Sequence, residues 1–164
     1  MKDNIVLIGM PSVGKSTAGV VLAKIMGMKF VDTDLIIQQK YKQKLHNIIE
    51  ERGTEEFLRL ENETISKIEQ NGAVIATGGS VVYGEDAMRH LKEIGTIVYL
   101  DLDFEYLKKR LHNIKDRGVV LKDGQSIRDI YDERYPLYIK YADIIIDENS
   151  KDIEQTIEAI IEKL

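Results

Sequence analysis

The chain contains no cysteine, which excludes a disulfide framework, a zinc ribbon and a thiol nucleophile. Its three histidines, His46, His90 and His112, lie too far apart to form a local metal-binding motif. No apolar run approaches the length needed to cross a bilayer. The chain has 23 basic residues against 28 acidic ones, which gives a net charge of −5. This charge creates no overall positive field that would attract nucleic acid or an anionic membrane. An anionic ligand must therefore be held locally.

What the sequence does contain is the composition of an ordinary globular protein. Hydrophobic residues make up 43% of its 164 positions and charged residues 31%, which excludes the disordered and collagen-like classes. Because this length suits one compact domain, we expect residues 1–164 to form a single domain with a single site. The first residues, MKDNIVLIG, lack a signal-peptide pattern, so the expected location is the cytoplasm.

Short apolar runs that end in Gly or Asp alternate with longer stretches of helical periodicity, which is typical of βα units around a parallel sheet. The expected strands are 4–9, 29–32, 73–77, 96–101 and 143–147. The expected helices are 15–26, 35–49, 54–70, 85–93, 104–114, 126–141 and 151–163. Residues 113–125 combine glycine, charge and weak periodicity, which predicts a mobile loop. The pattern predicts a three-layer α/β/α protein with a five-stranded parallel sheet.

The strongest motif is GMPSVGKS at residues 9–16, an unbroken G-x-x-x-x-G-K-S between an expected strand and an expected helix. In this setting the backbone N–H groups of residues 12–16 converge on phosphate oxygens, and the helix dipole adds to their attraction. Gly14 allows the backbone to come close to the phosphate. Lys15 can reach the β- and γ-phosphates, and Ser16 places a hydroxyl where Mg²⁺ bridges the same oxygens. The motif predicts a phosphate-binding loop, or P-loop, for a nucleotide.

The P-loop by itself names no reaction, because GTPases, transporter ATPases and small-molecule kinases share it. GTPases commonly carry N-K-x-D, whereas the nearest string here, NIKD at 113–116, has a different order. Transporter ATPases are much longer and usually carry L-S-G-G-Q, of which DGQ at 123–125 is only a partial match. A short kinase is the class that remains.

Two acidic residues, Asp32 and Asp34, stand at the carboxyl end of the second expected strand. We expect this strand to lie next to the P-loop strand, at the edge where open α/β sheets bind ligands. While the strand conformation lasts, the two carboxylates face the same way, so one can reach Mg²⁺ and the other a substrate hydroxyl. The alternative is an ordinary turn with Asp34 as a helix N-cap. TGGS at 77–80 suits either a second ligand-binding backbone or a strand-end turn.

In order and spacing these motifs resemble the shikimate kinase family over essentially the whole chain. The similarity consists of the P-loop at 9–17, DTD at 32–34, GTEEFLRLE at 53–61, Gly78-Gly79, Arg110 and Arg117, and RYPLY at 134–138 with Ala142. Members are small monomeric enzymes of the nucleoside-monophosphate-kinase-like P-loop fold that transfer the γ-phosphoryl group of ATP to the 3-hydroxyl of shikimate. The resemblance implies a monomer with a small hydroxy acid as substrate, ATP and Mg²⁺ as cofactors, and a mobile lid near residues 112–124.

The resemblance implies which residues hold the nucleotide. They are Ser12, Val13, Gly14, Lys15, Ser16, Thr17, Arg110 and Arg117. Of these, Arg110 would lie over the adenine, and Arg117 would descend with the lid onto the phosphates. Ser16 would bind the metal together with Asp32, for which Asp101 at the end of another strand is the alternative. Closure of the lid would exclude water that otherwise hydrolyses ATP.

On the acceptor side, the resemblance assigns the accepting hydroxyl to Asp34, which would bind it as a candidate base. Gly79 would contact the same substrate. Arg134 would grip its carboxylate, because a guanidinium offers two donors to a carboxylate. The candidate catalytic residues are then Lys15, Asp34 and Arg117.

Three positions depart from the family pattern. Leu58 stands where members carry an arginine that pairs with the shikimate carboxylate, and Arg59 cannot replace it because one helical residue turns the side chain by about 100°. Loss of such a charged hydrogen bond weakens binding by roughly ten- to a hundredfold. Alternatively, Leu58 only fills the helix packing. Gly118 and Ser80 stand in place of a proline and a third glycine.

The sequence as a whole predicts an ATP- and Mg²⁺-dependent small-molecule kinase that binds neither nucleic acid nor membranes. Shikimate is the leading acceptor. Leu58 favours a second hypothesis, in which the acceptor is a different small hydroxy acid or a polyol. A third hypothesis is a regulatory protein that binds nucleotide but has lost phosphotransfer.

Overall fold

The structure is a computed structural model that describes residues 2–111 and 119–164. Its sheet has five parallel strands in the order β2-β3-β1-β4-β5. The strands are β1 (Asn4–Ile8), β2 (Lys29–Asp32), β3 (Ala73–Ala76), β4 (Gly95–Asp101) and β5 (Ile144–Asp147). The helices are α1 (Lys15–Met26), α2 (Thr33–Tyr41), α3 (Leu45–Arg52), α4 (Thr54–Ile65), α5 (Glu85–Ile94), α6 (Phe104–Arg110), α7 (Ile127–Tyr141) and α8 (Ile153–Lys163), with a 3₁₀ turn η1 (Val81–Tyr83).

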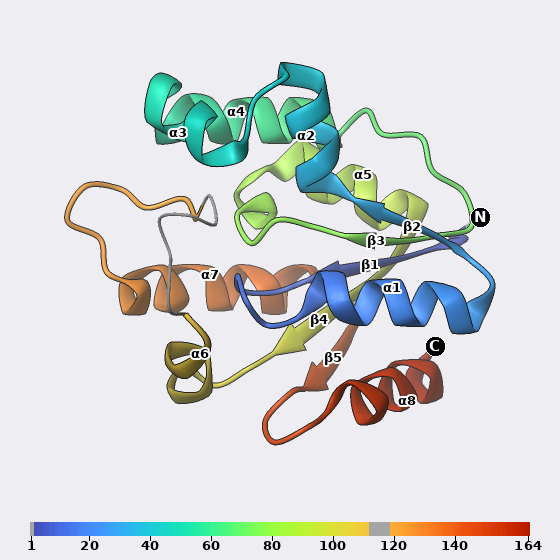
Figure 1. Ribbon diagram of the computed structural model, residues 1–164. Helices are drawn as coiled ribbons and strands as arrows, with labels where there is room; N and C mark the ends of the chain where they lie inside the picture. Colours follow the sequence, from blue (N-terminus) through green and yellow to red (C-terminus); the bar gives the residue numbers. More distant parts are fainter. Residues whose placement is uncertain (1, 112–118) are drawn as a thin grey trace.

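The molecule has three layers, as the sequence predicts (Figure 1). Helices α1 and α8 pack against each other on one face of the sheet, and α5 and α7 cover the other face. Helices α2 and α3 pack on α4, which in turn packs on α5. The central strands β1 and β3 are buried at every residue, because helices cover both of their faces. In the described part of the chain, no helix has both the length and the apolar character that a bilayer span requires.

The strand order corrects one expectation, because β2 is not the neighbour of the P-loop strand β1. Strand β3 lies between them, pairing with β1 through Ile5 and Val74 and with β2 through Phe30 and the same Val74. Residues on the ends of β2, β3 and β1 nevertheless face one common edge, since all of these strands run in the same direction. The acidic residues after β2 therefore still reach the P-loop, across the end of β3.

The single helix expected at 35–49 is wrong, since two helices, α2 and α3, occupy this segment. The chain turns at Lys42, whose φ of 53° is left-handed, and its backbone N–H donates to the Gln38 carbonyl as a helix C-cap. The Gln38 side chain then accepts from the Leu45 N–H, where α3 begins. Neither glycine nor proline marks this break in the sequence, so periodicity alone continues one helix through it.

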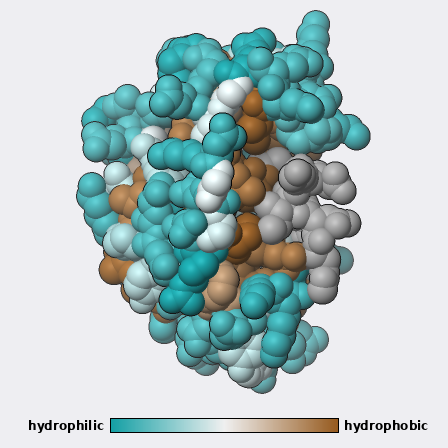
Figure 2. Space-filling model, turned by 90° about the vertical axis from the view of Figure 1, so that its left-hand side faces the viewer, coloured by the Kyte–Doolittle hydropathy of each residue, from teal (hydrophilic) through white to brown (hydrophobic). Residues whose placement is uncertain are grey.

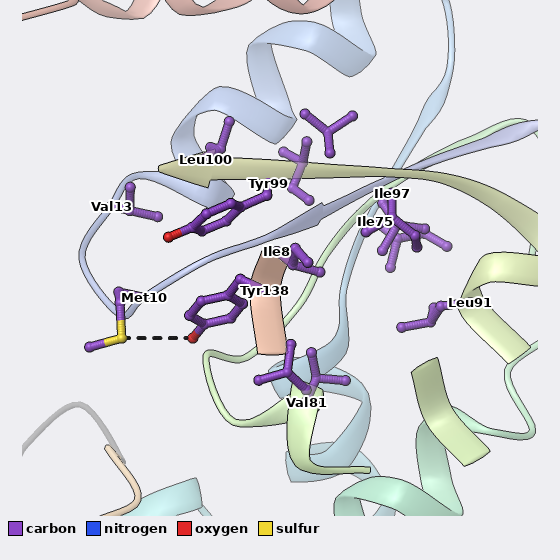
Figure 3. Packing of buried hydrophobic residues seen from close by; sticks show 14 of the residues in the cluster. Ile8, Met10, Val13, Ile75, Val81, Leu91, Ile97, Tyr99, Leu100 and Tyr138 are labelled. Carbon is purple, nitrogen blue, oxygen red and sulfur yellow. Dashed lines mark hydrogen bonds between the residues drawn. The ribbon is translucent and has the colours of Figure 1, made fainter. Parts of the chain in front are cut away.

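The core reaches the loops that form the site through Tyr138 of α7 (Figure 3). The Tyr138 ring is fully buried and stacks on Tyr99 of β4, with ring centroids 5.0 Å apart. Its hydroxyl donates to the Gly79 carbonyl at 2.6 Å and lies 3.8 Å from Met10 Sδ. Residues of two loops are thus held to the same core side chain, which fixes the P-loop relative to the loop after β3.

Candidate active site

The P-loop joins β1 to α1 and has the backbone that its sequence predicts. Gly14 is the N-cap of α1 with φ of 103°, a conformation that residues with a side chain rarely adopt. A Cβ built on Gly14 meets nothing within 4 Å, so the backbone conformation, not crowding inside the protein, requires glycine there. At Gly9 crowding also counts, because a Cβ would lie 2.8 Å from the Leu100 carbonyl oxygen.

Lys15, the first residue of α1, is almost fully buried at 7% exposure. Its Nζ donates to the carbonyl oxygens of Gly9 at 2.7 Å and Met10 at 2.8 Å. Burial lowers the pKa of Lys15 to about 8, against the opposing attraction of the Asp34 carboxylate. The ammonium is therefore mainly charged at neutral pH, and it lies against two carbonyl oxygens of the loop.

Ser16 and Asp32 meet beside the loop, across the sheet edge from different elements. Ser16 Oγ donates to Asp32 Oδ2 at 3.2 Å. Asp32 Oδ1 accepts from the backbone N–H of Asp34 at 2.9 Å, so Asp32 is the N-cap of α2. The alternative interpretation of the sequence, with Asp34 as the N-cap, is therefore wrong about which residue caps the helix. In the described residues no cluster of three or more metal-ligating side chains occurs. A hydroxyl and a carboxylate in contact are nonetheless oxygen donors that suit Mg²⁺ when phosphate and water complete its shell.

Asp34 lies in the first turn of α2 and lines a cavity of about 240 Å³ together with Lys15. Burial raises the pKa of the Asp34 carboxyl to about 6, and the like charge of Asp32 adds to the rise while Lys15 opposes it. The sequence suggests that Asp34 continues the strand and faces the same way as Asp32. In the structure Asp34 instead belongs to helix α2. It still reaches the same cavity as the P-loop.

Arg134 of α7 lies opposite in the same cavity and is only 1% exposed. Its Nη2 donates to the Val120 carbonyl at 3.1 Å, and its guanidinium lies over the Tyr83 ring at 5.3 Å. Gly79 also lines this cavity, and a Cβ there would approach Pro11 Cδ to 2.7 Å and Arg134 Nη1 to 3.0 Å. Glycine is thus required at 79 so that the loop after β3, the P-loop and Arg134 can approach one another.

The cavity opens at the edge to which the carboxyl ends of the strands point. Its other lining residues include the apolar Leu45, Phe57, Val119 and Val120. Figure 2 shows the molecule from this side, with a band of hydrophobic residues between hydrophilic surfaces. Hydroxyl residues such as Thr77 and Ser80 line it as well. A recess that combines apolar walls with a few converging polar and charged groups is typical of a site for a small polar ligand.

Glu61 of α4 is a buried acidic residue that the sequence analysis left without a role. It is 2% exposed, its Oε1 accepts from Ser80 Oγ at 2.7 Å, and its Oε2 has no hydrogen-bond partner. A Cβ on Gly78 would lie 2.7 Å from Asp34 Oδ1 and 3.1 Å from Glu61 Oε2, so the two carboxyls flank that glycine. The spacing of the sequence indicates this burial, because Glu61 follows Phe57 by four residues and so lies on the same, buried face of the helix.

Replacement of Glu61 by glutamine is expected to stabilise the protein at alkaline pH. Burial raises the pKa of Glu61 from 4.5 to about 7, with Asp34 adding to the rise and both Ser80 and Arg134 opposing it. The folded protein holds this proton where the unfolded chain releases it, so the wild type loses stability as pH rises from 4.5 to about 7. In Glu61→Gln this loss, on the order of 3 kcal/mol, should disappear.

Thermal denaturation at about pH 5 and pH 8 measures this difference. Glu56→Gln is the matched control, because it removes the same charge from a surface position of the same helix. We expect the control to keep the wild-type decline in melting temperature between the two pH values. A Glu61→Gln protein with an undiminished decline would contradict the assignment of a buried proton to Glu61.

The two arginines assigned to the nucleotide differ in what the structure describes. Arg110, the last residue of α6, donates from Nη1 to the Val13 carbonyl at 3.3 Å, beside the outer side of the P-loop. Arg117 and Gly118 lie outside the described residues, as does most of the predicted lid. Two backbone carbonyls of its described part, residues 119–124, accept hydrogen bonds from other segments. Val120 accepts from Arg134, and Leu121 accepts from Thr54 Oγ1 at 3.2 Å.

Leu58 is half-buried and packs against the hydrophobic core, and it is not among the residues that line the cavity. This geometry agrees with the packing role that the sequence left open. Asp101, the alternative metal carboxylate, accepts from the Tyr99 hydroxyl at 3.0 Å, and it lines a different depression. Asp32 is therefore the carboxylate that stands beside Ser16.

The arrangement defines a class of protein. The site combines a P-loop at a helix N-terminus with a carboxyl and a buried guanidinium in the adjoining cavity. This combination is typical of a phosphotransferase that moves a phosphoryl group from a nucleotide to a small molecule. An ionised carboxyl such as that of Asp34 can accept a hydrogen bond from a hydroxyl.

Comparisons with known proteins agree with this class and narrow it to a family. The family model of shikimate kinase matches residues 11–164. A shikimate kinase from Sulfurihydrogenibium sp. is 35% identical over 162 residues, which cover 98% of this chain and 97% of the relative. The chain belongs to the shikimate kinase family.

Solved structures support the same relationship. The chain is similar to the shikimate kinase from Acinetobacter baumannii in complex with shikimate, with a TM-score of 0.89 and 29% identity over 98% of this chain and 92% of the other. It is also similar to the shikimate kinase from Aquifex aeolicus, with a TM-score of 0.81 and 31% identity over 97% and 94% of the two chains. The predicted P-loop kinase fold is confirmed.

Proposed function

We propose that this protein is a shikimate kinase that transfers the γ-phosphoryl group of ATP to the 3-hydroxyl of shikimate. The observation that carries the proposal is one cavity lined by Lys15, Asp34 and Arg134, with the P-loop at its edge. Each of these groups matches one part of the reaction. Lys15 suits the anionic phosphoryl donor, Asp34 suits the hydroxyl that loses a proton, and Arg134 suits the carboxylate of the acceptor.

The P-loop and α1 form the donor side. The backbone N–H groups of Ser12, Val13, Gly14, Lys15, Ser16 and Thr17 would bind the phosphates, with the dipole of α1 behind them. Ser16 and Asp32 would hold Mg²⁺, directly or through water. When bound, the ion would neutralise charge on the β- and γ-phosphate oxygens. Arg117 keeps its proposed role on the phosphates through the family resemblance alone.

Asp34, Gly79 and Arg134 form the acceptor side. With its pKa near 6, Asp34 is mainly ionised at neutral pH and can accept a hydrogen bond, and then the proton, from the hydroxyl that attacks phosphorus. Arg134 would bind the acceptor carboxylate with two parallel hydrogen bonds. The close approach of Gly79 to Arg134 would bring the backbone of the loop after β3 against the same substrate.

Catalysis in this proposal is mainly positioning and charge neutralisation. Arg134 fixes one end of the acceptor while Asp34 orients its hydroxyl toward the γ-phosphorus. Lys15, and Arg117 with it, offsets the charge that spreads over the transferring group. Once the acceptor is bound, apolar side chains of the lining, among them Phe57 and Val120, would help to keep water out of the remaining space.

A coupled assay of ADP release tests the function over a panel of shikimate, other small hydroxy acids and polyols. We expect turnover with shikimate and Mg²⁺, and no turnover without the metal. Turnover only with another member of the panel would show that this compound, and not shikimate, is the acceptor. ATP binding without turnover on any acceptor would instead support a regulatory nucleotide-binding protein.

The second candidate, a kinase for a different hydroxy acid or a polyol, rests on the sequence: the family places an acceptor-binding arginine at position 58, whereas Leu58 here packs against the core and does not line the cavity. Leu58→Arg is expected to lower the KM for shikimate by about tenfold, since one charged hydrogen bond to the carboxylate is restored. Steady-state kinetics with varied shikimate at saturating ATP measure this change. An unchanged or raised KM would count against shikimate in the cavity beside Phe57.

The remaining parts of the proposal concern the protein as a whole. We infer that residues 1–164 act as one domain and as a monomer in the cytoplasm, without nucleic acid or membrane partners. The net charge of −5 and the lack of cysteine support this inference.

A further inference from the structure

Tyr83, the last residue of η1, is half-buried against Arg134 and does not itself line the cavity. The guanidinium carbon of Arg134 lies 5.3 Å from the centre of the Tyr83 ring, and Arg134 Nε donates to the Tyr83 hydroxyl at 3.4 Å. The hydroxyl in turn donates to Glu133 Oε1 at 2.6 Å. Tyr83 therefore contacts the guanidinium with both its ring and its hydroxyl.

The hydroxyl of Tyr83 is itself held in one orientation. A tyrosine hydroxyl has one proton to donate and lone pairs that accept. Burial raises the pKa of Tyr83 above its ordinary value of 10, so the hydroxyl keeps its proton at neutral pH. Glu133 receives this hydrogen bond, and the other oxygen of the Glu133 carboxylate accepts from Gln125 Nε2 at 3.2 Å. Because the proton is directed at Glu133, a lone pair of the hydroxyl is left for the Nε–H of Arg134.

These contacts determine which donors of Arg134 are left for a ligand. Nε has a single N–H, which Tyr83 accepts, and Nη2 gives one of its two N–H groups to the Val120 carbonyl at 3.1 Å. Nη1 lies toward Gly79, where a Cβ would approach it to 3.0 Å. The free N–H groups of Nη1 and Nη2 stand at the end of the guanidinium, where two parallel hydrogen bonds to a carboxylate can form. Among the described residues that line the cavity, Arg134 is the only arginine.

We propose that Tyr83 is a positioning residue of the acceptor site, whose hydroxyl holds the Nε side of Arg134 so that the Nη1 and Nη2 end meets the acceptor carboxylate. This inference rests on the proposed function, in which Arg134 binds that carboxylate. Tyr83 itself touches no substrate. Loss of its hydroxyl lets the guanidinium turn, which weakens binding of the acceptor and leaves the nucleotide and the chemical step unaffected.

Tyr83→Phe tests this role, because it keeps the ring under the guanidinium and removes only the hydroxyl. Its KM for shikimate should rise about five- to tenfold, as for the loss of one hydrogen bond, while kcat and the KM for ATP change little. Tyr106→Phe is the matched control, since it removes a hydroxyl that contacts Ser150 Oγ at 3.3 Å outside the cavity, and it should keep all wild-type values. An unchanged KM for shikimate in Tyr83→Phe would overturn the inference.

A double-mutant cycle shows whether Tyr83 acts through Arg134. If it does, its effect must disappear when the guanidinium is absent, so adding Tyr83→Phe to Arg134→Met should leave kcat/KM for shikimate unchanged. This ratio is measurable even where shikimate no longer saturates the enzyme. A merely structural role of Tyr83 would lower kcat/KM by the same factor with and without Arg134, and that outcome would overturn the inference as well.

Nitrogen-15 NMR of the arginine Nε–H groups tests the contact without turnover. The Arg134 signal, identified by its absence in Arg134→Lys, should move in Tyr83→Phe, because its acceptor is lost, and should stay in place in Tyr106→Phe. Wild-type turnover of shikimate together with an unmoved signal in Tyr83→Phe would overturn the inference alone. No turnover by the wild type with any acceptor would refute the proposed function, and the inference with it.

Discussion

Replacement of Lys15 by alanine is expected to lower kcat by about a hundred- to a thousandfold with every acceptor. The Lys15 ammonium stands in the P-loop within hydrogen-bonding distance of two loop carbonyls, and it is positioned to move onto a bound phosphate. Its removal leaves the charge on the transferring phosphoryl group without this buried cation. Steady-state kinetics by ADP release, with both substrates saturating, measure the loss.

The fold should survive this substitution. Burial lowers the pKa of Lys15, which means that the folded protein binds this proton less well than the unfolded chain does. The charge therefore costs stability at neutral pH, and its removal offsets part of the loss of the two hydrogen bonds. Lys24→Ala, on the exposed last turn of the same helix, is the matched control and should keep full activity. A folded Lys15→Ala protein with wild-type kcat would remove Lys15 from the mechanism.

Replacement of Arg134 by methionine is expected to raise the KM for shikimate by about a hundredfold or more, since two charge-assisted hydrogen bonds to the carboxylate are lost. The KM for ATP should change little, because the proposed function places Arg134 on the acceptor side of the cavity that it lines. Arg134→Lys keeps the charge but not the two-donor geometry, so its KM should be intermediate. Kinetics with each substrate varied in turn separate these effects.

Arg128 provides the control for this series, because it lies on the same helix and pairs at the surface with Asp132. Arg128→Met should leave both KM values at the wild-type level. The basal hydrolysis of ATP reports whether the Arg134 variants are folded. A folded Arg134→Met protein with an unchanged KM for shikimate would move the acceptor carboxylate elsewhere.

Much of the fold can be predicted because buried strands and amphipathic helices leave strong periodic signals. The bounds of α1 and β2 agree with the sequence pattern at every residue, since Gly14 and Gly27 stand on either side of α1. The order of the strands could not be predicted. It depends on which apolar surfaces pair in space, and neighbouring strands of a parallel sheet need not be neighbours in the chain.

The P-loop was the most predictable part of the site because its function depends on backbone conformation, which Gly9 and Gly14 record in the sequence. Side chains that act together from distant segments were harder to predict. The contact between Glu61 and Ser80 joins positions 19 residues apart, and neither residue type alone indicates it. Family resemblance identified Arg134, whereas its near-complete burial beside Gly79 is a property that only the folded chain reveals.

The acceptor chemistry is the central claim, and direct identification of the product tests it most sharply. The protein is incubated with ATP, Mg²⁺ and shikimate, and the mixture is followed by phosphorus NMR. We predict stoichiometric formation of ADP and of a phosphate monoester whose phosphorus couples to the ring proton at carbon 3 of shikimate. Formation of ADP with inorganic phosphate alone, or an ester at another hydroxyl, would contradict the account.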